Sequence, residues 1–87
     1  MITREKLKEI GFKELSHFAI GNPLNYNFSR GRFLSISCIG TPNEMMVIGQ
    51  KDDDASNEVT DLVVLHNWDY DNFLKIDKVK SIIKILR

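Results

Sequence analysis

The chain is poor in cysteine and in long apolar runs. Cys38 is its single cysteine among 87 residues, so no disulfide can form within the chain. A lone cysteine argues against a secreted scaffold held by disulfides and favours a reducing compartment. No segment approaches the roughly 18 apolar residues of a membrane-spanning helix, and the charged first residues lack the apolar core of a signal peptide. We therefore expect a cytoplasmic protein with no membrane partner.

An excess of charge of either sign is also missing, because 12 Lys and Arg balance 12 Asp and Glu. Proteins that bind nucleic acid normally present a basic surface, so the balance argues against nucleic acid as a partner. A chain near zero charge is less protected from self-association, which keeps a homodimer among the expected states. The length fits one domain, residues 1–87, with a small core.

The apolar pattern predicts helices at the two ends of the chain and strands between them. We expect a helix over residues 3–10, a strand over 12–20, a hairpin over 25–40, strands over 45–50 and 59–65, and a helix over 77–87. Short connections require antiparallel neighbours. The predicted fold is therefore α+β: a small antiparallel meander of four or five strands, with an N-terminal and a C-terminal helix packed on one face.

Local signals place several residues within these elements. Thr3 is the expected N-cap of the first helix, and Gly11 is expected to stop it. Pro42 suits the second position of a turn before the strand at 45–50. Cys38 follows the alternation of a strand and is expected to be a small buried side chain. Residues 62–65 are all apolar, so both faces of a strand there would be apolar. This favours a central position in the sheet for the strand over 59–65.

The most distinctive segment is residues 66–73, between the last strand and the last helix. It contains the only Trp of the chain and supplies the candidate binding residues Trp68, Tyr70, Asp69, Asp71 and His66. Trp and Tyr dominate binding hot spots because they bury a large area with few rotatable bonds. The structural alternative is that Trp68 and Phe73 plug the open end of the core, while Asp69 or Asp71 caps a short helical turn. A mixture, with Phe73 inward and Tyr70 outward, satisfies both.

A metal or small-ligand site is a second hypothesis for the same segment. His66, Asp69 and Asp71, with His17 as a further candidate, have the imidazole and carboxylate groups that metals accept. Their spacing matches no metal template, and neither Asp52 nor Asp69 opens an EF-hand loop. We therefore expect no metal and no cofactor.

Catalysis has weak support in the sequence. Cys38, His17 and Asp69 contain the groups of a nucleophile, base and orienting acid, but no local motif joins them. A phosphate-binding glycine loop, a paired-carboxylate motif and a CxxC motif are all missing from the sequence. The prediction is that this protein is not an enzyme.

Two charged clusters complete the candidates. Arg30 and Arg32 flank the expected hairpin tip, and residues 52–54 are three consecutive aspartates. The first pair is typical of a solvated turn and the second of a solvated loop. Both together leave a third hypothesis, a modulator of nucleic acid or nucleoprotein that acts through the arginines or through acidic mimicry.

Two segments carry a resemblance. Residues 3–12 and 65–71, under half of the chain, resemble short uncharacterised proteins of gut Bacteroides-type bacteria and their phages. The resemblance implies a small intracellular protein and brings no activity, cofactor or catalytic residue with it.

The function that the sequence favours is a non-enzymatic protein–protein interaction module. Its expected surface is the aromatic and acidic connection at residues 66–73, and its partner is another protein or a second copy of the chain. The alternatives are the ligand or metal site and the nucleic-acid or nucleoprotein modulator.

Overall fold

A computed structural model of the chain describes residues 1–15, 20–51 and 59–87, and it has three helices around an antiparallel sheet. The elements in chain order are α1 (Arg4–Glu9), β1 (Lys13–Glu14), β2 (Leu24–Asn27), the 3₁₀ turn η1 (Ser29–Gly31), β3 (Arg32–Ser37), β4 (Met45–Lys51), β5 (Val59–His66), α2 (Trp68–Asp71) and α3 (Ile76–Leu86). This arrangement confirms the predicted α+β fold.

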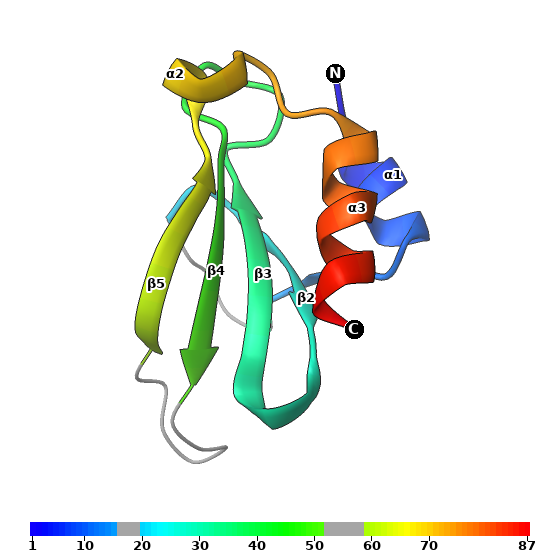
Figure 1. Cartoon of the computed structure of the whole chain (residues 1–87). Helices are drawn as coiled ribbons and strands as arrows, with labels where there is room; N and C mark the ends of the chain where they lie inside the picture. Colours follow the sequence, from blue (N-terminus) through cyan, green and yellow to red (C-terminus); the bar gives the residue numbers. More distant parts are fainter. Residues whose placement is uncertain (16–19, 52–58) are drawn as a thin grey trace.

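The five strands lie side by side in the order β1-β2-β3-β4-β5, so each strand pairs with its neighbour in the sequence. Figure 1 shows α1 and α3 together on one face of the sheet, as predicted, and α2 beyond the ends of β4 and β5. The edge formed by β5 is the one farthest from α3. The helices therefore cover one side of the sheet and leave the other side open.

Capping residues and charged side chains near the ends of α1 and α3 suit the helix boundaries that the structure shows. The Thr3 hydroxyl accepts a hydrogen bond from the N–H of Lys6 at 3.2 Å and caps α1, as predicted. Gly11, with a φ of +115°, follows the helix where a left-handed residue ends it. In α3, Asp77 lies in the first turn and Lys84 in the last, which suits the helix dipole. Among the described residues, no helix is long and apolar enough to cross a lipid bilayer.

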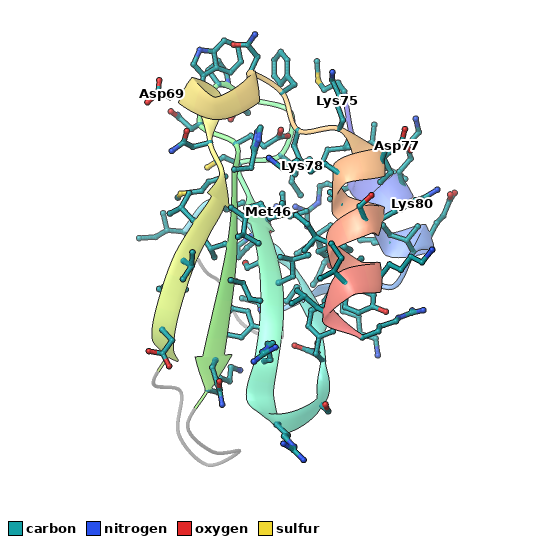
Figure 2. All side chains as sticks on the ribbon, in the orientation of Figure 1. Met46, Asp69, Lys75, Asp77, Lys78 and Lys80 are labelled. Carbon is teal, nitrogen blue, oxygen red and sulfur yellow. The ribbon has the colours of Figure 1, made fainter. Side chains whose placement is uncertain are left out.

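The core lies between the helices and the middle of the sheet. Met46 of β4 points into this layer toward α3 (Figure 2) and is fully buried. The buried cluster draws on α1, α3, strands β2 to β4 and the segments that adjoin the helices: Ile2, Leu7, Phe12, Leu24, Leu34, Ile36, Met46, Leu74, Val79 and Ile83. Leu65 is the member of β5 that packs against this cluster, and it is only partly buried. The helices thus protect β2, β3 and β4 more completely than β5.

Tight turns join the central strands. At the β2–β3 tip, Gly31 has a φ of +77°, and a Cβ there would lie 2.6 Å from the carbonyl oxygen of Lys51, so this position requires glycine. Between β3 and β4, the N–H of Glu44 donates to the carbonyl of Thr41 at 2.9 Å. Pro42 occupies the second position of that turn, as the sequence predicts.

The second face of the sheet carries a small apolar group of its own. Phe33 of β3 pairs with Gly49 of β4 and is buried. A Cβ at Gly49 would lie 2.7 Å from the Phe33 ring and 2.9 Å from the Leu62 side chain, so both side chains extend across this glycine. Phe33 and Leu62 therefore share the face opposite the helices.

One prediction about the sheet is wrong. The strand over 59–65 was expected at the centre of the sheet, but β5 is an edge strand that pairs with β4 alone. The apolar pattern describes what a strand prefers to contact, whereas sheet order follows connectivity. Short connections keep consecutive strands adjacent, so the last strand of a meander lies at its edge.

Two smaller expectations also need correction. Of the strand expected over 12–20, the described residues show only β1 paired with a neighbour, and residues 16–19 lie outside the described part of the chain. β3 ends at Ser37, so Cys38 lies in the following turn with a φ of +52° and is half-buried. The amide of Cys38 donates to the carbonyl of Gly21 at 2.9 Å, which holds this turn beside the segment that leads into β2.

An exposed ion-pair cluster joins α1 to β1. The Glu14 carboxylate lies 3.0 Å from the Lys8 ammonium and 3.1 Å from the Arg4 guanidinium. Hydrogen bonds from Lys8 first and Arg4 second hold the pKa of Glu14 below its usual range. Arg4 also donates to the carbonyl of Asn22 at 2.6 Å, which ties the helix to the segment before β2.

Two isoleucines of α3 offer a matched test of this core. Ile83 is 6% exposed and Ile85 is 79% exposed, although they are two residues apart in one helix. We expect Ile83→Ala to lower the free energy of unfolding by about 2–5 kcal/mol, because it leaves a cavity. Ile85→Ala should change it by less than about 0.5 kcal/mol. Urea unfolding measures both, and equal losses would contradict the packing of α3 described above.

Candidate functional site

The segment that follows β5 folds into the short helix α2 because an asparagine caps it. Asn67 has an extended backbone, and its side-chain oxygen accepts a hydrogen bond from the N–H of Asp69 at 3.0 Å. Asn72 ends the helix with a φ of +52° and a ψ of −117°, which lies outside the left-handed helical region and is rare for a residue with a side chain. The cap is thus Asn67, and the expectation that Asp69 or Asp71 caps this turn is wrong.

His66 lies inside the molecule and not on the expected surface. Its side chain is fully buried, and Nε2 lies 3.1 Å from the carbonyl oxygen of Asn72. A carbonyl oxygen only accepts, so Nε2 carries the proton and donates it. The contact closes the α2 segment back onto the end of β5. Any contribution of His66 to binding therefore comes through the position of this segment.

Glu44 makes the second contact that fixes the connection, and it is a residue that the sequence did not single out. Its side chain is fully buried at the start of β4. One carboxyl oxygen accepts from the N–H of Gly40 at 2.7 Å and the other from the N–H of Leu74 at 2.6 Å. The second bond joins residues 30 positions apart. Glu44 therefore ties the turn after β3 to the segment that leads into α3.

The bond to Leu74 satisfies a buried backbone N–H. Leu74 is fully buried between α2 and α3, where neither a helix nor a strand supplies an acceptor for its N–H. An unpaired buried N–H costs roughly 1–3 kcal/mol. Hydrogen bonds from backbone N–H groups to a carboxyl group are among the stronger ones in proteins. Buried glutamate at this position therefore stabilises the connection, and no local sequence signal distinguishes it from an exposed turn residue.

The aromatic pair of the segment sits on this fixed connection. Trp68 and Phe73 pack edge to face, with ring centroids 5.2 Å apart and planes at 88°. Phe73 is half-buried, whereas 40% of Trp68 remains exposed. Phe73 thus supports the indole from one side and leaves a large aromatic surface open to solvent.

The acidic residues of the segment lie around α2. Figure 2 shows Asp69 on the side of α2 that faces away from α3, and its side chain is exposed. Among the residues that the structure describes, Asp69 makes no ion pair. Tyr70 and Asp71 belong to the same helix, but their side chains lie outside the description. Trp68 and Asp69 therefore define the described part of an aromatic and acidic surface, which we call the α2 surface.

The other candidate sites fare differently. The described residues contain no group of three His, Cys, Asp or Glu side chains placed to hold a metal ion. His17 and residues 52–54 lie outside the description. Arg30 and Arg32 line a surface pocket of about 430 Å³ at the β2–β3 tip, together with Phe28, Ser29, Gln50 and Leu86.

Substitution of Glu44 tests its role. Glutamine keeps the shape but replaces one acceptor oxygen with an N–H donor, so one backbone N–H loses its partner. We expect Glu44→Gln to lower the free energy of unfolding by about 1–3 kcal/mol and to speed hydrogen exchange at the Leu74 amide. The control is Glu9→Gln, since Glu9 is exposed at the end of α1. If Glu44→Gln matches this control in urea unfolding, the two bonds do not fix the connection.

Comparisons with protein-family models, with curated proteins and with solved structures found no match to this chain. The resemblance carried by residues 3–12 and 65–71 therefore stays a prediction. The described residues offer a partly exposed tryptophan beside an acid that forms no ion pair with any of them, on a connection held by two buried polar side chains.

Proposed function

We propose that this protein is a non-enzymatic protein-binding module that uses the α2 surface. The observation that carries the proposal is the state of Trp68, which is 40% exposed while packed edge to face on Phe73. An aromatic side chain held in place loses little conformational entropy on binding, and this is the property of a hot spot.

The anchoring of the segment supports the same function. Glu44 and His66 hold the backbone at Leu74 and Asn72 before any partner arrives. Because the order is already present, binding to the α2 surface does not have to fix a flexible loop. The two buried side chains act as positioning residues, and Trp68 supplies the contact area.

The charge of the surface indicates the chemistry of the partner. Asp69 is exposed and without an ion pair among the described residues, and it lies next to the exposed indole in the chain. A lysine or arginine on a partner can meet the carboxylate and the face of the indole together. The partner that fits best is a protein surface with a basic side chain beside an apolar pocket.

A variant of Trp68 tests the proposal. Affinity capture with the wild-type chain should retain a protein that Trp68→Ala loses, because removal of a hot-spot aromatic costs at least tenfold in affinity. Ile85→Ala is the matched control, since Ile85 is an exposed apolar residue on α3. The control should retain the same protein.

The single tryptophan gives a second, direct readout. In a chain labelled with fluorotryptophan, fluorine NMR should show one resonance, from Trp68. Addition of the captured protein should shift that resonance. A protein that binds wild type and Trp68→Ala equally, or that leaves the resonance in place, binds elsewhere and counts against the α2 surface.

A further inference from the structure

The outer edge of β5 is open among the residues that the structure describes. β5 pairs with β4 on one side, and no described strand pairs with its other side. In Figure 1 this edge lies farthest from α1 and α3, so neither helix covers it. An edge strand exposes a row of backbone N–H and C=O groups that another strand can use.

Apolar side chains are exposed on both faces of this edge. Leu62 is 59% exposed and Val64 is 40% exposed. Both lie on the face of Phe33: Leu62 meets the Phe33 ring across Gly49, and Val64 pairs with Val47 on that face. Val63 is 53% exposed on the helix-covered face, where it pairs with Ile48. Three consecutive exposed aliphatic residues on an edge strand form an apolar patch. A partner strand at this edge would place side chains beside them on both faces of the sheet.

The features that usually protect an edge are sparse here. The sequence of β5, VTDLVVLH, contains no lysine, arginine or proline. Register shifts against β4 mark bulges at Leu65 and at Asp61, which has a φ of +55°, whereas Leu62 lies opposite Gly49. Bulges also protect an edge, but these two lie on either side of residues 62–64 and leave that short stretch regular and apolar.

We propose that two copies of this chain pair through β5, antiparallel and about a two-fold axis at Val63. Such pairing places Val63 opposite Val63 of the second copy on one face. On the other face it places Leu62 opposite Val64 of the second copy, twice. Every exposed apolar residue of the stretch then meets an apolar partner, and the two sheets become one continuous sheet.

A second copy fits this edge better than a charged partner, because the chain has no net charge and β5 carries a single acidic residue away from the proposed axis. The chain has no net charge, so two copies do not repel each other at long range. Asp61 is the one acid in β5. With the axis at Val63, the two Asp61 residues lie about four residue steps, or ~13 Å, apart along the strands. That separation exceeds the screening length of about 8 Å at physiological salt, so their repulsion is small.

The contact is short, so the dimer should be weak and dependent on concentration. Sedimentation velocity between about 10 μM and 1 mM should show a mass that rises from 10.0 kDa toward twice that value. Val63→Lys and Val64→Lys should remain monomeric over the same range, because lysine blocks edge pairing. Ile85→Lys, the control on α3, should dimerise like the wild type.

Cysteine cross-linking locates the axis in variants close in shape to the wild type. In a Cys38→Ser background, single cysteines replace Leu62, Val63 or Val64. Residues directly opposite in an antiparallel pair have Cβ atoms about 4.5–5.5 Å apart, so an added oxidised glutathione can convert two axial cysteine thiols into a disulfide between the copies while it is itself reduced. We expect Val63→Cys to form the covalent dimer fastest, and Ile85→Cys to form it at least tenfold more slowly.

Two results would overturn the proposal: a chain that is monomeric at every concentration, or a dimer that persists in both lysine variants. Neither result bears on the α2 surface, because Trp68 follows the axis by five residues along the chain. Trp68→Ala should dimerise like the wild type, and Val63→Lys should still bind the protein captured through Trp68. The two proposals therefore fail independently.

Discussion

Both oxygens of the Glu44 side chain are used by backbone N–H groups, and the course of the chain after β5 depends on them. Between α2 and α3 the backbone passes through the interior without a strand or helix partner for Leu74. A buried glutamate supplies the missing acceptor and at the same time holds the turn before β4. His66 adds a third bond, to the carbonyl of Asn72. These three bonds hold the backbone on which the aromatic pair of Trp68 and Phe73 stands, although the buried Nδ1 of His66 has no hydrogen-bond partner among the described residues.

A second constraint is the unequal cover of the sheet. Two short helices supply enough apolar surface to bury the core residues of β2, β3 and β4, and β5 receives little of it. A chain of 87 residues has a high ratio of surface to volume, so part of the sheet stays exposed. The exposed apolar side chains of β5 and the exposed Trp68 of α2 therefore lie close together in the sequence.

The predictable parts of this structure depend on neighbouring residues. The Thr3 cap, the stop at Gly11, the turn at Pro42 and the stripe of α3 each follow from chemistry within a few positions. Sheet order and the burial of Glu44 depend on residues far apart. A glutamate after a proline turn is expected to be exposed. Glu44 is buried because the fold places Leu74, 30 positions later in the sequence, beside its carboxyl group. Likewise, the apolar run of β5 indicates that the strand needs cover but not whether this chain provides it.

The contact between Glu44 and Leu74 also bears on how the chain folds. Each pair of neighbouring strands joins segments close in the sequence, and such local contacts form quickly. Hydrogen bonds between the described residues also join distant segments: the Leu74 N–H donates to Glu44 across 30 positions, and Arg87 donates to the Tyr26 hydroxyl across 61. Both require the last third of the chain, so the hairpins can assemble before α3 arrives. Until that part of the chain is in place the Glu44 side chain lacks one of its two backbone partners, so the bond to Leu74 belongs to the final packing of the sheet.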